Sequence, residues 1–181
     1  MKLIFVRHGQ TDFNKNKIVQ GQEMDPPLND TGIKQVEDAA KSLPDDIDLI
    51  ISSPLKRASQ TAEILNRKLN KRIEFSDDMK ELSYGSLAGK SWSEIEAITG
   101  DKDVHQKERD TLFDYRKYGG NSAEDLKQTV ANFISELKEK YSDKVILVTS
   151  HGGVIDAMHV LFPQKERPAR HNATIHEFIF E

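Results

Sequence analysis

Leu3-Ile4-Phe5-Val6-Arg7-His8-Gly9-Gln10-Thr11 is the stretch that decides the fold, because a short apolar run ends there abruptly in an arginine, a histidine and a glycine. The unbroken branched and aromatic residues at 3–6 are typical of a strand buried on both faces of a parallel sheet. The polar residues that follow then lie at the carboxyl end of the strand, where open α/β sheets bind ligands. By itself, a histidine after a strand is more often structural than catalytic.

The composition of the 181-residue chain is typical of one globular domain, residues 1–181. Hydrophobic residues make up 36% and charged residues 31%, which suits a soluble protein with a proper core and leaves little room for a second domain. The net charge of −4 provides no basic surface for nucleic acid, so we expect no nucleic-acid partner. An anionic ligand would have to be held by a few local positive charges.

The sequence contains no cysteine, which excludes disulfides and thiolate metal sites. No apolar run is long enough to cross a bilayer, and no hydrophobic signal region precedes the first strand. We therefore expect no membrane partner and predict a cytoplasmic location.

Apolar runs alternate with stretches of helical periodicity along the chain. Further strands are predicted at 47–51, 73–75, 145–148 and 173–180. Helices are predicted from about 30 until Pro44, at 58–69, from the capping box at Ser91–Glu94, from Asn121 or Ser122 through 137, and through 154–161. The segment at 12–30 is predicted to be a polar loop. Strands separated by helices predict an α/β fold, a three-layer sandwich with a mostly parallel sheet flanked by helices.

Residues 101–118 are densely charged and lack a clear period, and we treat them as a charged covering insertion in the domain. Two interpretations are open for this segment. Its composition favours a solvated surface excursion by about two to one over the alternative, a cover over a pocket.

Three of the predicted strands end in polar clusters, at 7–9 (Arg-His-Gly), 52–57 (Ser-Ser-Pro-Leu-Lys-Arg) and 150–153 (Ser-His-Gly-Gly). If these strands are near neighbours in a parallel sheet, two histidines, two arginines and several glycine N–H groups meet at one edge. The planar guanidinium of arginine binds phosphate oxygens bidentately, and helix N-termini after the strands add N–H groups. The sequence therefore predicts a phosphate pocket at this edge.

The sequence lacks the residues that other kinds of phosphate-binding and phosphoryl-transfer sites need. There is no Walker-type glycine loop, no cysteine nucleophile, and no carboxylate at ligand spacing beside His8 or His151, so we predict neither a metal nor a cofactor. A metal-free phosphate pocket with two histidines indicates histidine itself as the nucleophile. One imidazole must be neutral to attack phosphorus. The other, if protonated, would help the arginines to stabilise the transition state.

Five blocks of the chain together resemble the histidine phosphatase superfamily, whose fold is shared by cofactor-dependent phosphoglycerate mutases and many small phosphatases. The blocks, in family order, are Arg-His-Gly-x-Thr-x-x-Asn at 7–14, Asp-x-Pro-Leu at 25–28, Ser-Ser-Pro-Leu-Lys-Arg-Ala at 52–58, Glu81 with Gly85 and Gly89, and Ser-His-Gly-Gly at 150–153. They cover most of the chain, and together they imply a phosphoglycerate mutase-like fold.

The resemblance also implies a role for each site residue. His8 would attack the phosphoryl group and become phosphohistidine, and Glu81 would protonate the leaving oxygen and later help to activate water. The phosphate would be held by Arg7, Arg57 and His151. Positions that contact phosphate or substrate are matched by Asn14, Gln20, Gly21 and Gly152. Spacing alone would favour an ordinary surface glutamate at position 81, and only the family match reverses that interpretation.

Within the family, the sequence favours a phosphatase, because Leu82 follows Glu81 where mutases usually have an arginine, and because the chain is short. We expect a metal-independent phosphomonoesterase that acts on small phosphorylated metabolites. The first alternative is a cofactor-dependent phosphoglycerate mutase, and the second is a non-catalytic phosphate-binding regulatory module. A monomer or a homodimer is expected, since the last strand could pair at an exposed sheet edge.

Overall fold

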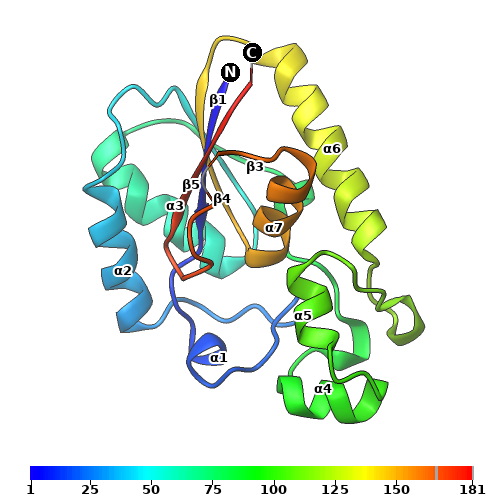
Figure 1. The fold of residues 1–181 in the computed structure, drawn as a ribbon. Coiled ribbons are helices and arrows are strands. Elements are labelled where there is room, and N and C mark those ends of the chain that lie inside the picture. The colour runs from blue at the N-terminus through cyan, green and yellow to red at the C-terminus, as the bar shows by residue number, and fades with distance from the viewer. Residues whose placement is uncertain (166, 181) are drawn as a thin grey trace.

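A five-stranded sheet with the strand order β3-β2-β4-β1-β5 forms the centre of the computed structural model, which describes residues 1–165 and 167–180 (Figure 1). The strands are β1 (Lys2–Arg7), β2 (Leu49–Ser52), β3 (Ile73–Phe75), β4 (Val145–Ser150) and β5 (Ile175–Ile179). All neighbouring strands pair in parallel except β5, which pairs antiparallel to β1 at one edge. The prediction of a mostly parallel sheet is confirmed.

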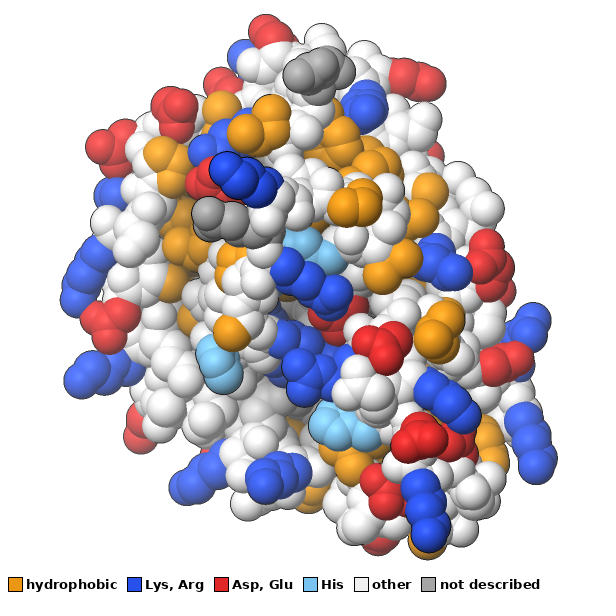
Figure 2. Space-filling model, in the orientation of Figure 1, with side chains coloured by type: hydrophobic (Ala, Val, Ile, Leu, Met, Phe, Trp, Pro, Cys, Tyr) orange, Lys and Arg blue, Asp and Glu red, His pale blue; other side chains and the backbone are white. Residues whose placement is uncertain are grey.

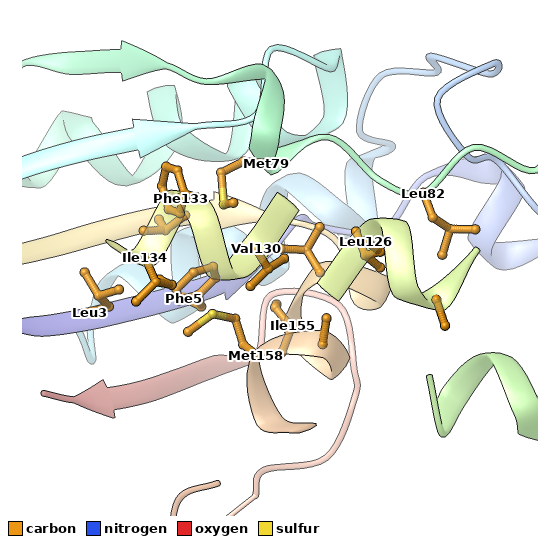
Figure 3. Packing of buried hydrophobic residues seen from close by; sticks show 14 of the residues in the cluster. Leu3, Phe5, Met79, Leu82, Leu126, Val130, Phe133, Ile134, Ile155 and Met158 are labelled. Atoms are coloured by element: carbon orange, nitrogen blue, oxygen red, sulfur yellow. The ribbon is translucent and has the colours of Figure 1, made fainter. Parts of the chain in front are cut away.

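Helices cover both faces of this sheet, which gives the three predicted layers (Figure 1). One face carries α2 (Asp30–Ala40) and α3 (Lys56–Leu69), and the other carries α6 (Ala123–Lys140) and α7 (Gly152–Leu161). Successive residues of β1 point to opposite faces, so Leu3 and Phe5 join one hydrophobic cluster while Ile4 joins the other. Figure 3 shows Leu3 and Phe5 packed beside Ile134 of α6.

Several of the helices begin where the sequence supplies side-chain caps. Asn29 accepts a hydrogen bond from the N–H of Gly32 at the start of α2, and Ser122 forms a capping box with Asp125 at the start of α6. The predicted capping box of Ser91 and Glu94 opens α4 (Trp92–Thr99). Among the described residues, no helix combines the length and the apolarity that are needed to cross a membrane.

Several predicted boundaries differ from the structure. Helix α2 ends at Ala40 rather than at Pro44, because 41–43 donate to carbonyls three residues back and close a tight turn before the proline. Strand β2 begins at Leu49 instead of 47, α3 begins at Lys56 instead of 58, and β5 is shorter than 173–180. The predicted loop at 12–30 contains a short helix, α1 (Asp12–Lys15), capped by Thr11.

The prediction that 101–118 is a solvated surface excursion holds only in part, because most of its charged side chains are exposed but several other side chains are buried. This segment, which we call the cover, contains α5 (Val104–Arg109) and buries Glu108, Phe113 and Tyr115. The rings of Phe113 and Tyr115 stack, and Tyr115 also stacks on Tyr84. Tertiary contacts of this kind leave no periodic signal in the sequence. Three short 3₁₀ helices complete the fold at Asp77–Met79, Gly85–Leu87 and Arg116–Tyr118.

Candidate active site

The three polar clusters of the sequence meet at the carboxyl ends of β1, β4 and β2, which are neighbours in the sheet. The ring centroids of His8 and His151 lie 5.2 Å apart, and Nε2 of His151 lies 2.8 Å from Oγ of Ser53. We call the group of His8, Arg7, Arg57, Glu81 and His151 the phosphate pocket, after the role that the sequence predicts for it.

The backbone fixes the tautomer of His8, which is almost completely buried. Its Nδ1 lies 2.7 Å from the carbonyl oxygen of Gly9. A carbonyl only accepts hydrogen bonds, so Nδ1 carries the proton and the lone pair of the neutral ring is on Nε2. Burial lowers the pKa of His8 well below its usual value, and the positive charges of Arg57 and Arg7 lower it further. The ring is therefore neutral at neutral pH, with the Nε2 lone pair available.

Two backbone carbonyls hold the guanidinium of Arg57, a side chain that is only 1% exposed. Nη2 donates to the carbonyl of Gly21 over 2.8 Å, and Nη1 donates to the carbonyl of Met24 over 3.0 Å. Gly21 has φ of +60°, and a Cβ there would come within 2.8 Å of the Tyr84 ring. The chain at position 21 therefore needs glycine to reach the arginine.

Arg7, at the end of β1, is held by a segment from the other end of the chain. Its Nη1 donates to the carbonyl of Arg170 over 2.7 Å, while its Nε has no partner among the described residues. Burial lowers the pKa of Arg7 to about 10, with a contribution from the nearby charge of Arg170. Arg7 still carries its positive charge at neutral pH.

His151 lies at the N-terminus of α7, and the hydroxyl of Ser53 orients its ring. This hydroxyl accepts from the N–H of Leu55 over 3.3 Å, so its own proton is free to donate to Nε2 of His151. When the hydroxyl donates in this way, the ring proton is on Nδ1, which has no partner among the described residues. Burial lowers the pKa of His151 well below its usual value, with further contributions from Arg57, His8 and Arg7. The second imidazole is thus neutral rather than protonated.

Glu81 is not the ordinary surface glutamate that spacing alone would favour, because the structure buries it. Its Oε1 accepts from the N–H of Leu82 over 3.0 Å and from the N–H of Gly153 over 3.2 Å. Burial raises the pKa of Glu81 above its usual value; the charge of Arg170 opposes this rise, and that of Glu108 adds to it. A raised pKa favours the protonated form that a proton donor needs.

The remaining predicted residues line or support the same edge. Oδ1 of Asn14 accepts from the N–H of Thr11 over 3.1 Å, and Oε1 of Gln20 accepts from the Thr11 hydroxyl over 2.9 Å. These contacts hold the chain that follows His8. Gly152 packs so closely on Arg170 that a Cβ would lie 2.4 Å from Nη2.

Sequence reasoning missed two residues of this site, Arg170 and Asn172, which lie in the loop before β5. Asn172 donates from Nδ2 to the carbonyl of His8 over 3.0 Å. Arg170 forms part of the wall of a cavity of about 350 Å³ between α5, α7 and this loop. Figure 2 shows basic, acidic and histidine side chains gathered around a hollow on this face. The only available signal was the polar run Arg-His-Asn before the last strand.

Within the described part of the chain, no group of three or more histidine, cysteine, aspartate or glutamate residues is arranged to hold a metal ion. The phosphate pocket instead combines two neutral imidazoles, two guanidinium groups and one buried carboxyl group. It offers a nucleophile, positive charge for an anion and a proton donor.

The sequence model of the histidine phosphatase superfamily (branch 1) matches residues 3–178. An uncharacterized phosphatase, PhoE, of Bacillus subtilis is 33% identical over 155 residues, which cover 84% of this chain and 72% of that protein.

Two solved structures extend the comparison. A mycobacterial glucosyl-3-phosphoglycerate phosphatase in complex with VO3 has a TM-score of 0.82 at 26% identity, covering 97% of this chain and 91% of that one. A phosphoserine phosphatase of Entamoeba histolytica in complex with 3-phosphoglyceric acid has a TM-score of 0.76 at 28% identity, covering 99% and 90%. These relatives support the predicted enzyme class, a hydrolytic phosphatase. With a match over nearly its whole length, the chain belongs to the histidine phosphatase superfamily.

Proposed function

We propose that this protein hydrolyses small phosphomonoesters through a phosphohistidine formed on His8, without a metal ion. The observation that carries the proposal is the hydrogen bond from Nδ1 of His8 to the Gly9 carbonyl. It leaves the Nε2 lone pair free in a pocket that also contains two guanidinium groups.

In the first step, Nε2 of His8 attacks phosphorus and the bond to the leaving oxygen breaks. Glu81 gives its proton to that oxygen, so the product leaves as an alcohol. Arg7 and Arg57 stabilise the charge on the phosphoryl oxygens, and His151 donates a hydrogen bond from Nδ1.

In the second step, water attacks the phosphohistidine and the P–N bond breaks. The carboxylate of Glu81, which lost its proton in the first step, accepts a proton from this water. Inorganic phosphate leaves, and both His8 and Glu81 return to their starting states.

The printed names of the relatives support small phosphorylated metabolites as the substrate class. One relative is a glucosyl-3-phosphoglycerate phosphatase and another is a phosphoserine phosphatase. We propose the same broad class for this chain. The alternatives from the sequence, a cofactor-dependent mutase and a non-catalytic phosphate-binding module, make different predictions in the same experiment.

The test is phosphate release in excess chelator from a panel of phosphomonoesters that includes 3-phosphoglycerate, with and without 2,3-bisphosphoglycerate. The wild-type protein and the His8→Ala variant are measured side by side. We expect release from one or a few esters that is lost in His8→Ala, and an acid-labile phosphohistidine in the wild type only. Bisphosphate-dependent isomerisation without release would support a mutase. Phosphate binding without turnover or labelling would support the non-catalytic module.

Glu81→Gln tests the proton donor. An amide cannot supply the proton, so we expect hydrolysis of alkyl phosphates to slow by about 10²- to 10⁴-fold. Release of p-nitrophenol in a single turnover, which reports the first step alone, should slow much less, because this leaving group departs without protonation. Equal losses in single-turnover release of the two leaving groups would argue against this role of Glu81.

Strand β5 lies at the sheet edge and its Ile179 side chain is exposed, which supports pairing with a second copy as one option. A monomer or a homodimer in the cytoplasm stays our prediction. Sedimentation equilibrium distinguishes the two assemblies.

A further inference from the structure

Arg170 joins the cover to the body of the protein through two buried ion pairs. Its Nη2 lies 2.9 Å from Oε1 of Glu108 on α5, and its Nη1 lies 2.9 Å from Oδ2 of Asp156 on α7. The side chains of Glu108 and Asp156 are 2% and 4% exposed, and that of Arg170 is 18% exposed. Charges this deeply buried are costly unless they are paired, so the geometry of the three groups is tightly coupled.

Arg170 also contacts the phosphate pocket in two places. Its guanidinium lies against Gly152, the residue after His151, because a Cβ at Gly152 would be 2.4 Å from Nη2 and 2.5 Å from Nε. Its backbone carbonyl accepts the hydrogen bond from Arg7. One residue therefore supports the N-terminus of α7 and orients the guanidinium at the end of β1.

The contacts of Arg170 argue against a direct role in binding phosphate. Both terminal nitrogens are engaged by carboxylates, and Nε is buried against Gly152. We propose that Arg170 is a positioning residue of the phosphate pocket and that Glu108, through its pairing with Arg170, couples the cover to the proton donor Glu81. The assignment of Glu81 rests on the proposed function.

Glu81 lies beside this ion-paired group, because its Oε1 accepts from the N–H of Gly153 over 3.2 Å and the preceding residue, Gly152, packs on the Arg170 guanidinium. The charged groups that face it are Arg170 from the loop before β5, Glu108 from α5, Arg57 from α3 and Arg7 at the end of β1. The Tyr84 hydroxyl is also close, but burial raises its pKa well above the usual value and keeps it neutral. Arg170 lowers the pKa of Glu81 and Glu108 raises it, while burial remains the largest cause of the rise. Removing the cation and removing the anion should therefore shift the protonation of Glu81 in opposite directions.

The experiment compares Arg170→Gln and Glu108→Gln by the pH dependence of kcat for an alkyl phosphate. The alkaline limb of this profile reports the protonated carboxyl group of the enzyme–substrate complex. We expect the limb to move to higher pH in Arg170→Gln and to lower pH in Glu108→Gln, each by of the order of one pH unit. A carboxyl ¹³C NMR titration of Glu81 in the same variants checks the same opposite shifts without depending on turnover.

Arg167→Gln is the matched control. Arg167 pairs with Asp156 at the same distance, 2.9 Å, but its side chain is 51% exposed and it belongs to the same loop. We expect its pH profile and kcat to stay within about twofold of wild type, as is usual for an exposed ion pair.

Arg170→Lys keeps the positive charge but loses the guanidinium group that pairs with both Glu108 and Asp156. This variant tests the proposal even if Arg170→Gln does not fold. We expect its alkaline limb to stay in place while kcat falls about tenfold, because a lysine cannot hold both carboxylates in the same geometry. The proposal would be overturned if the pKa of Glu81 shifted in the same direction in Arg170→Gln and Glu108→Gln. It would also be overturned if neither method detected a shift of this pKa in folded protein. If the wild-type protein had no phosphatase activity but the NMR titrations of the two variants showed opposite shifts in the pKa of Glu81, the proposed function would be overturned and the coupling would still be supported.

Discussion

Two pairs of buried histidines have nearly the same separation and very different surroundings. The ring centroids of His8 and His151 lie 5.2 Å apart, and those of His159 on α7 and His176 on β5 lie 5.1 Å apart. In the second pair, Nε2 of His159 is 2.9 Å from Nδ1 of His176, so these two nitrogens form a hydrogen bond with each other. In the first pair each ring bonds to a different neighbour, Gly9 or Ser53.

The difference shows that two neighbouring imidazoles do not make a reactive site by themselves. The first pair lies at strand ends between the guanidinium groups of Arg7 and Arg57, which lower the pKa of both rings and attract an anion. The second pair packs on the ring of Phe178, 4.9 Å from His159. It has a buried ring nitrogen without a partner among the described residues but lies outside the phosphate pocket.

The largest expected contrast between the pairs is in turnover. His8→Gln should lower kcat/KM by more than about a thousandfold, because an amide cannot form the phosphoenzyme. His176→Gln should stay within about twofold, since the hydrogen bond of its ring goes to His159 and not to a residue of the phosphate pocket. Steady-state kinetics on one substrate checks both variants. If kcat/KM fell nearly as far in folded His176→Gln as in His8→Gln, the distinction between the two pairs would be wrong.

A smaller contrast is expected in the binding of the product. His151→Gln removes a hydrogen bond to a charged group, so we expect inhibition by inorganic phosphate to weaken by about 10- to 100-fold. His159→Gln should leave the inhibition constant unchanged. Competition assays at a single pH measure both. Equal inhibition constants in the two variants would place His151 outside the phosphate-binding role.

The smallest effect concerns stability in acid, where the two pairs should behave alike. Burial lowers the pKa of His159 and of His176 to about 4, and of His8 and His151 well below 6.5. The unfolded chain then binds protons first, so the free energy of unfolding should fall as the pH drops from about 6.5 towards 4. His159→Gln and His151→Gln should each flatten this fall. Urea unfolding at pH 7 and pH 5 measures it, and an unchanged slope in both would contradict the expectation.

The strand ends show why much of this site could be predicted. The apolar run before Arg7 and His8 is a local signal. The run predicts the strand, and the change to polar residues predicts its carboxyl end. The same holds for β4 and His151. The caps at Asn29, Ser91 and Ser122 are equally local signals, and each opens a helix in the structure.

The parts that could not be predicted depend on contacts between distant segments. Glu108 is a charged residue in a charged stretch, and nothing local indicates that it pairs with Arg170 inside the protein. The burial of Tyr115 depends in the same way on a stacked ring from Tyr84. For this reason the cover and the loop before β5 emerged only from the structure, although both adjoin a pocket whose strand-end residues were found from the sequence.

The supports of His8 come from a segment that lies far from it along the chain. Asn172 holds the carbonyl of His8, Arg170 holds Arg7, and β5 pairs with β1 along its length. A nascent chain on the ribosome therefore has its nucleophile long before the segment that orients it has left the exit tunnel. We expect the protein to become active only after residues 170–179 have been made, and activity measured during translation would report their arrival.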